Sequence, residues 1–240
     1  MIDGPLLMID TSSFTGSVAL VERNRVLGEV LLNVRATHSE RLMITVDQLL
    51  RDAGVSVGDI AAFGAVLGPG SFTGLRIGVA TVKALALAVD RPLVGVTSLE
   101  TLAMNAPFCS LPVCALIDAR KKEVYAAMYD CRNGSTPREL RPPVVMPPEE
   151  LIASLEGDLL FIGDGVQVYR HFILHQMRQG AHFLPASLND VRASQAASLA
   201  WRKLDEEGGV PQHGFLPVYL RPSDAEIMWE KRRAEAGIEG

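Results

Sequence analysis

Several shortages in the sequence each exclude a class of protein. The 240 residues include three cysteines, Cys109, Cys114 and Cys131, which form no C-x-x-C pair. This odd count argues against a disulfide framework and a structural zinc site, and it favours a reducing compartment. An excess of basic residues is also missing, because the formal net charge is −5. We therefore do not expect the chain to bind nucleic acid unaided.

Long apolar runs are missing as well. No uninterrupted apolar stretch approaches the ~18 residues that cross a bilayer, so no contact with a membrane is expected. The N-terminus has no basic region followed by an apolar signal stretch, which favours a cytoplasmic location. The basic clusters at residues 120–122 and 231–233 are short and have acidic neighbours, which is typical of solvated surface.

What the sequence does contain is a repeated order of strands and helices. The first half predicts a β-β-β-α-β-α-β unit, with elements at residues 6–9, 16–21, 26–32, 37–53, 63–67, 74–89 and 93–96. A Thr-His-Ser-Glu capping box opens the first of these helices. The second half begins with the same apolar strand ending in Ile-Asp, followed by a polar turn and a second strand, at residues 113–130. A short helix at 147–155, a strand at 159–162 and an amphipathic helix at 194–207 follow.

Two halves with one plan predict two lobes around a cleft. We assign residues 1–104 to an N-terminal lobe and 105–214 to a C-terminal lobe that is a diverged repeat of the first. Residues 215–240 form a C-terminal tail that could return to the first lobe. The alternative is that the likeness of the two hairpins arose by chance.

The stretch GPGSFTGLRIG at residues 68–78 is as rich in glycine as a phosphate-binding loop. Its glycine spacing, however, matches none of the known phosphate-binding motifs. A Walker loop requires Lys and then Ser or Thr after its last glycine, where this sequence has Leu75 and Arg76. The glycines also fit neither a dinucleotide fingerprint nor a hydrolase nucleophile elbow. A helix N-terminus remains, which can hold an anion. Close backbone packing is the favoured role, and Gly68 and Gly70 stay candidates for cofactor binding.

Several longer motifs resemble the TsaB (YeaZ) family. They are MIDTSSFTGSVAL, THSERLM, GPGSFTGLRIGVATVKALAL, GVTSLETLA and IDARKKEVYAAMY, which span nearly all of residues 8–129 in the family's order. The second half resembles the family through GDG at 163–165 and PVYLR at 217–221. The resemblance implies an α/β, two-lobed actin-like ATPase (ribonuclease-H-like) fold, in which each lobe is a mixed sheet flanked by helices.

The same resemblance implies a role in tRNA modification. Members of the family act with TsaD and TsaE to place a threonylcarbamoyl group on the adenosine beside the anticodon of certain tRNAs. TsaD, the catalytic relative, carries His-x-Glu-x-His where this sequence has Ser98, Glu100 and Leu102. Serine and leucine do not replace histidine as ligands of a transition metal. We therefore expect a non-catalytic assembly subunit with no catalytic residue and no metal site, and we expect ATP and a divalent metal in the partner subunits.

Two aspartates mark where a cofactor could bind. Asp10 and Asp118 end the first strand of each half, where actin-like ATPases keep the carboxylates that organise magnesium. Ser12 stands where those proteins have glycine, and Arg120 also replaces a glycine-bearing loop. Asp10, Ser12 and Asp118 join the two loop glycines as cofactor candidates, and no tight ATP binding is expected from this chain alone.

The helix at residues 74–89 is apolar on two sides, and only Arg76 and Lys83 in it are charged. A helix that is apolar all round is buried all round. We therefore predict that its second side meets a partner, together with the preceding helix, through Leu42, Val46, Ile77, Ala80, Ala84, Leu87 and Ala88. The alternative is that the helix at 37–53 covers that side within the chain. The resemblance implies pairing with TsaD, or homodimers when the chain is alone, with tRNA reached only through the complex.

A second function is a free-standing hydrolase or peptidase of the same fold. It would require a complete nucleophile or metal constellation. His171 and His175 share one helical face, but Phe172 stands where a zinc protease needs glutamate. The sequence contains no constellation of either kind, which favours the assembly subunit.

Overall fold

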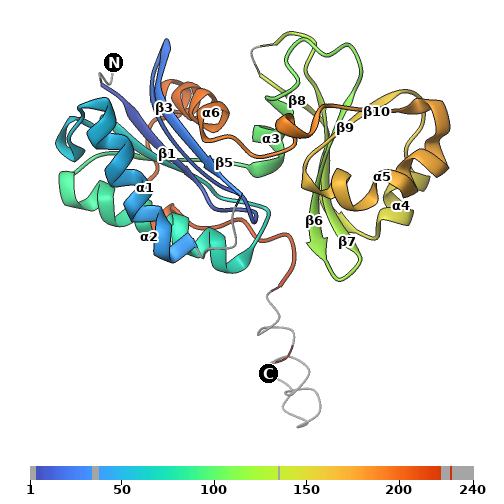
Figure 1. Cartoon of the computed structure of the whole chain (residues 1–240), viewed down its shortest axis with the longest axis horizontal. Coiled ribbons are helices and arrows are strands. Elements are labelled where there is room, and N and C mark those ends of the chain that lie inside the picture. Colours follow the sequence, from blue (N-terminus) through green and yellow to red (C-terminus); the bar gives the residue numbers. More distant parts are fainter. Residues whose placement is uncertain (1–3, 34–37, 135, 223–227, 229–240) are drawn as a thin grey trace.

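The computed structural model describes residues 4–33, 38–134, 136–222 and 228 (Figure 1). Two features of the sequence lie outside these residues: Thr37 of the predicted capping box and the basic cluster at 231–233.

The first lobe is a mixed sheet of five strands in the order β3-β2-β1-β4-β5. The strands are β1 (Leu6–Asp10), β2 (Gly16–Glu22), β3 (Arg25–Leu32), β4 (Ala62–Val66) and β5 (Leu93–Val96). β1, β2 and β3 pair antiparallel, whereas β4 and β5 run parallel to β1. Helices α1 (His38–Ala53) and α2 (Phe72–Val89) cover the outer face of this sheet (Figure 1).

The second lobe repeats this plan. Its strands are β6 (Val113–Arg120), β7 (Glu123–Asp130), β8 (Arg138–Met146), β9 (Leu159–Ile162) and β10 (Ala181–Phe183), in the order β10-β9-β6-β7-β8. β6, β7 and β8 pair antiparallel, and β9 and β10 run parallel to β6. Helices α4 (Pro148–Ala153) and α5 (Asp164–Met177) cover its outer face. Both sheets have the same strand order and the same pattern of parallel and antiparallel pairs. A chance likeness of two hairpins does not explain this agreement over five strands.

The third helix of each half lies on the sheet of the other half. Helix α3 (Ser98–Ala103) packs on β6 and β7, and α6 (Ala193–Glu206) packs on β1, β2 and β5. Helix α6, which lies within the predicted lobe at 105–214, thus packs on the first sheet, and α3, which lies within the predicted lobe at 1–104, packs on the second. The indole Nε1 of Trp201 in α6 donates a hydrogen bond to the carbonyl oxygen of Val21, 3.1 Å away. Trp201 is 5% exposed.

A single core fills the space between the two sheets. It combines the inner faces of both sheets with the apolar sides of α3 and α6. Leu6 and Met8 of the first sheet, Val113 and Ile117 of the second, and Leu99 of α3 are all at most 3% exposed. The molecule is thus layered as helices, sheet, exchanged helices, sheet and helices (Figure 1). Short 3-10 helices occupy Val57–Asp59, Arg178–Gly180, Ala186–Leu188 and Gln212–Gly214.

The described part of the tail runs from the first lobe to the second. Phe215 is fully buried in the core between the first sheet and its outer helices. Val218 N donates to Leu67 O at 2.7 Å, and the ring of Tyr219 stacks on Phe72 with centroids 4.5 Å apart. Arg221 then donates to Glu123 of β7. The tail therefore bridges the two lobes.

Helix α2 combines length with apolar composition. Among the described residues it is the one helix long and apolar enough to cross a membrane, and 33% of it is buried. The sequence analysis considered only uninterrupted apolar stretches. Arg76 and Lys83 interrupt such a stretch in α2, but the helix remains apolar on average. In the structure α2 begins at Phe72, after the N-cap residue Ser71, and one side of it packs on the first sheet.

Candidate functional site

A cavity of about 510 Å³ lies between the lobes. The β1–β2 turn lines it with Ser12, Ser13 and Phe14, and the N-terminal end of α2 lines it with residues 70–74 and Ile77. The second lobe and the tail contribute Ile117, Asp118, Ala119, Arg120, Tyr125, Asp164 and Arg221. The cavity therefore joins the parts of the sequence in which a cofactor was predicted to bind.

The glycines of the 68–78 loop allow two backbones to approach closely. A Cβ atom on Gly70 would lie 2.1 Å from the carbonyl oxygen of Ser12, and one on Gly74 would lie 2.0 Å from that of Thr11. Ser71 N donates to Ser12 O at 2.7 Å. Gly68 has a φ of +113°, and a Cβ there would lie 2.8 Å from Val218 O of the tail. The loop thus docks α2 on the end of β1, in line with the favoured packing role.

The second lobe uses the same device. A Cβ atom on Gly163, whose φ is +116°, would lie 2.2 Å from Leu116 O, and one on Gly165 would lie 3.0 Å from the same oxygen. Gly163 N donates to Asn189 Oδ1 at 3.1 Å. In both lobes a glycine-bearing helix N-terminus therefore packs closely against the backbone of the first strand or of the turn after it, because a side chain at these glycines would crowd a carbonyl oxygen.

A buried carboxyl group, Asp10, and a half-buried one, Asp164, lie at this joint, one from each lobe. Asp10 is 0% exposed, and its Oδ1 accepts a hydrogen bond from Ser12 N at 2.9 Å. Within the described residues its Oδ2 has no partner. Burial raises the pKa of Asp10 to about 7, and the charges of Asp164 and Asp190 add to the rise. Burial likewise raises the pKa of Asp164 to about 6.

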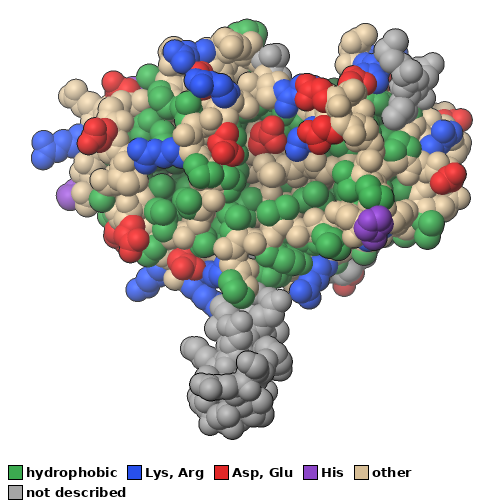
Figure 2. Space-filling view, turned by 180° about the vertical axis from the view of Figure 1, so that it is seen from behind, with side chains coloured by type: hydrophobic (Ala, Val, Ile, Leu, Met, Phe, Trp, Pro, Cys, Tyr) green, Lys and Arg blue, Asp and Glu red, His purple; other side chains and the backbone are tan. Residues whose placement is uncertain are grey.

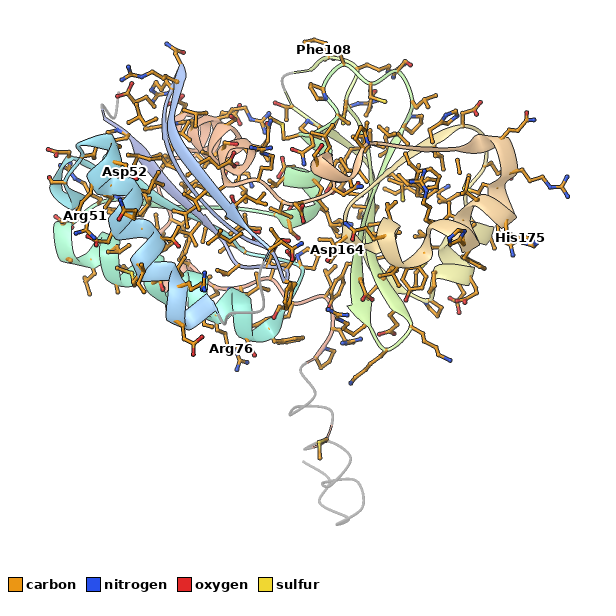
Figure 3. The ribbon with its side chains drawn as sticks, in the orientation of Figure 1. Arg51, Asp52, Arg76, Phe108, Asp164 and His175 are labelled. Atoms are coloured by element: carbon orange, nitrogen blue, oxygen red, sulfur yellow. The ribbon has the colours of Figure 1, made fainter. Side chains whose placement is uncertain are left out.

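Sequence reasoning missed Asp164, which lies between the two lobes in Figure 3. Its Oδ1 accepts a hydrogen bond from Asp118 N at 3.1 Å, so the structure places Asp164 beside Asp118, one of the predicted cofactor candidates. The available signal was its place in the GDG motif, at the end of a buried strand. Asp118 itself is held by Arg120, whose Nη1 lies 3.2 Å from Asp118 Oδ2. Ser12 lines the cavity, whereas Asp10 is buried beside it.

The residues that we expected to replace the metal ligands of TsaD take part in packing within this chain. Ser98 Oγ donates to Pro69 O at 2.6 Å, and Leu102 is 1% exposed in the inner core. Glu100 lies near Arg202 of α6, 3.8 Å away. In the part of the chain that the structure describes, no group of three or more His, Cys, Asp and Glu could hold a metal ion. His175 points outward from α5, away from the cavity (Figure 3).

The predicted partner interface is partly wrong. Leu42 and Val46 are 7% and 1% exposed because they face the first sheet and belong to the core beneath α1. On α1 the exposed apolar side chains are those of Met43 and Ile44. The rest of the predicted set lies on the outer side of α2, where Ile77 is half-buried and the others are exposed: Ala80, Ala84, Leu87 and Ala88.

We call these four exposed residues the α2 face. Leu87 is 70% exposed on it. Helix α1 does not cover the α2 face, contrary to the alternative that the sequence left open. The described residues of the chain therefore leave an apolar helix surface in contact with solvent.

Comparisons with known proteins agree with this architecture. The family model described as TsaD, tRNA N6-adenosine threonylcarbamoyltransferase, matches residues 25–229. The tRNA threonylcarbamoyladenosine biosynthesis protein TsaB of Bacillus subtilis is 32% identical over 226 residues, which cover 93% of this chain and 97% of that protein. The chain belongs to the TsaB family.

Other members agree in sequence and in fold. TsaB of Escherichia coli is 33% identical over 237 residues, covering 94% of this chain and 97% of its own. The solved structure of YeaZ from Pseudomonas aeruginosa is 34% identical and superimposes with a TM-score of 0.78, covering 91% of this chain and 100% of that one. The fold of this TsaB family member is the two-lobed actin-like fold that the sequence predicted.

Substitution of Gly74 tests the packing role of the loop. Gly74→Ala places a Cβ 2.0 Å from Thr11 O, so the backbone must shift. We expect the free energy of unfolding to fall by about 3 kcal/mol. Chemical denaturation measures this loss. Gly58→Ala is the matched control, because the nearest atom would be 3.7 Å away, and an equal loss in both variants would contradict the packing role.

Burial of Asp10 predicts a pH-dependent stability. The native state holds this proton more tightly than the unfolded chain, whose pKa is near 3.8. The carboxyl group therefore lowers the free energy of unfolding as pH rises from about 4 to about 7. Asp10→Asn removes the charge, so we expect it to stabilise by about 2 to 4 kcal/mol at pH 8 and by less at pH 5.

Denaturant titrations of parent and variant at both pH values measure the difference. Asp130 is the opposite control, because hydrogen bonds from Arg132 hold its pKa below the usual range and Asp130→Asn should not stabilise. If Asp10→Asn is less stable than the parent at pH 8, the raised pKa that we assign to Asp10 is wrong.

Proposed function

We propose that this protein is a non-catalytic subunit of the complex that places a threonylcarbamoyl group on the adenosine beside the anticodon of tRNA. The names of its relatives, tRNA threonylcarbamoyladenosine biosynthesis proteins, support the reaction. The observation that carries the non-catalytic role is the packing of Ser98 and Leu102. One is hydrogen-bonded to Pro69 O and the other is buried in the inner core, so neither position can ligate a metal.

The partners in this proposal are TsaD and TsaE, and a second copy of the chain when TsaD is absent. The α2 face supports such an interface, because it is apolar, exposed and mostly built of alanine. Small side chains let a partner helix approach closely, and Leu87 offers a large one to bury.

We place tight ATP binding and the divalent metal in the partner subunits. The glycines that would have to cradle phosphate already face carbonyl oxygens, at the short Gly70–Ser12 and Gly74–Thr11 approaches. Carbonyl oxygens repel phosphate, and no space for a phosphate group remains between these backbones. The free-standing peptidase is not favoured, because the described residues include no group that could hold a catalytic metal ion and the curated relatives are named for tRNA threonylcarbamoyladenosine biosynthesis.

Reconstitution tests the proposal. The purified chain alone should form no threonylcarbamoyladenosine on tRNA. A mixture with TsaD, TsaE, ATP and threonylcarbamoyl-adenylate should form it, and omission of this chain should abolish the product. Product formed by the isolated chain at the rate of the mixture would refute the non-catalytic role.

The interface is tested by Ala84→Glu at the centre of the α2 face. Because Ala84 is exposed, the substitution should cost only a few tenths of a kcal/mol in helix propensity and leave the melting curve nearly unchanged. A buried unpaired carboxylate in the complex costs several kcal/mol. We therefore expect affinity for TsaD to fall by about three orders of magnitude, measured by analytical ultracentrifugation.

An alanine-to-glutamate substitution outside the α2 face is the control. Ala153→Glu lies on the exposed side of α4 in the second lobe and should bind TsaD like the parent. If Ala84→Glu also sediments and binds TsaD like the parent, the interface lies elsewhere.

A further inference from the structure

The described part of the tail contains an apolar run that stays at the surface. Residues 216–220 read Leu-Pro-Val-Tyr-Leu, and we call them the tail strap. None of the five is fully buried, and Leu216, Val218 and Tyr219 are exposed. Surface segments are normally polar, and a run of exposed apolar residues is unfavourable unless another molecule covers it. The tail strap therefore has the composition of a contact surface.

The exposed side chains of the tail strap stand on a backbone that is held in place. Phe215, directly before the tail strap, is fully buried, and Val218 N donates to Leu67 O at 2.7 Å. The ring of Tyr219 stacks on that of Phe72 with centroids 4.5 Å apart. A partner would therefore meet a surface that is already formed, so that binding requires little further ordering of this segment.

The tail runs along one side of α2 before it reaches the second lobe (Figure 1). Tyr219 stacks on Phe72 and accepts a hydrogen bond from Nε of Arg76 at 3.1 Å. Farther along the helix, Lys83 Nζ donates to Phe215 O at 3.5 Å. Phe72, Arg76 and Lys83 are four and seven residues apart, so they form one stripe along α2. The tail covers this stripe.

The α2 face lies next to that stripe. Ala80 and Leu87 follow Arg76 and Lys83 by four residues each, and residues at this spacing are neighbours on a helix surface. The tail strap and the α2 face therefore lie side by side. Figure 2 shows hydrophobic side chains at the lower edge of the molecule, above the grey part of the tail.

The α2 face alone is too small for a stable interface. It has four side chains, and three of them are alanine. Each partner in a stable complex contributes about 20 to 30 residues, and the centre of such an interface is rich in large apolar and aromatic side chains. The tail strap adds side chains of this kind, because Leu216 is 59% exposed and Tyr219 is 39% exposed. An interface that begins on the α2 face can therefore reach the required size by continuing onto the tail strap.

We propose that the tail strap is part of the surface that binds TsaD, beside the α2 face. The inference rests on the proposed function, which brings TsaD to the α2 face. The match to the TsaD family model covers residues 25–229, which include both α2 and the tail strap, so TsaD shares this plan and can offer a matching helix. A second copy of the chain is the alternative occupant.

Two substitutions of Leu216 test the tail strap. Leu216→Asp changes an exposed side chain, so its melting temperature should equal that of the parent. In the complex this carboxylate would be buried without a partner, and we expect the Kd for TsaD to rise about thirtyfold. Leu216→Ala removes apolar area without adding charge and should raise this Kd about fivefold. Isothermal titration calorimetry measures both values.

A matched control lies in the second lobe. Val168 on α5 is 57% exposed, nearly as much as Leu216 at 59%. Val168→Asp adds the same charge to an exposed apolar position away from α2 and should keep the parent Kd. Sedimentation of the chain without TsaD measures self-association of each variant.

The outcomes are distinguishable from failure of the proposed function. A parent chain that does not bind TsaD refutes the proposed function. If Ala84→Glu loses TsaD while both variants of Leu216 keep the parent Kd, the inference about the tail strap alone is overturned. Weaker self-association with unchanged affinity for TsaD also overturns it and assigns the tail strap to the contact between copies. If Leu216→Asp is unstable, the Kd of Leu216→Ala decides between these results.

Discussion

The structure depends on one apolar core that two exchanged helices close. The inner faces of the two sheets do not meet each other alone, since α3 and α6 lie between them and each packs on the sheet of the opposite half. The hydrogen bond from Trp201 to Val21 O fixes α6 on the first sheet. Because both lobes share this core, the geometry of the cavity follows from the packing of these helices, and the tail adds a second bridge at its mouth.

Most of the first lobe could be predicted from the sequence. The apolar period of α1 and α2 and the short buried strand β5 are local signals, so their limits agree with the structure to within about two residues, as is usual for element ends. Strand β8 was missed, because it is an exposed edge with Pro142 and Pro143 and has no alternating pattern. Helix α5 was not among the elements predicted from apolar spacing, although His171 and His175 were placed on one helical face, because Val168 and Leu174 are exposed on it and interrupt its apolar stripe. The position of α6 is a tertiary property that no local pattern contains.

The sequence identified most of the residues at the candidate site, but not the contacts that these residues make. The glycine spacing excluded nucleotide motifs, and the structure supplies the reason for the glycines in the carbonyl oxygens of Thr11 and Ser12. The orientation of α1 was misjudged, since Leu42 and Val46 continue the stripe that packs on the sheet while Met43 and Ile44 face outward. The raised pKa of Asp10 could not be foreseen, because it comes from burial and from carboxylates of the other half.

The exchange of α3 and α6 also determines when, during translation, the first sheet can complete its packing. Ribosomes release the chain from its N-terminus, yet the first sheet receives its inner cover only from residues 193–206. Throughout translation of the second lobe, β1 and β2 have no α6 to pack against, and the apolar inner side chains of the nascent sheet stay open to water. The first sheet therefore cannot bury its inner face against α6 until residues 193–206 have been synthesised.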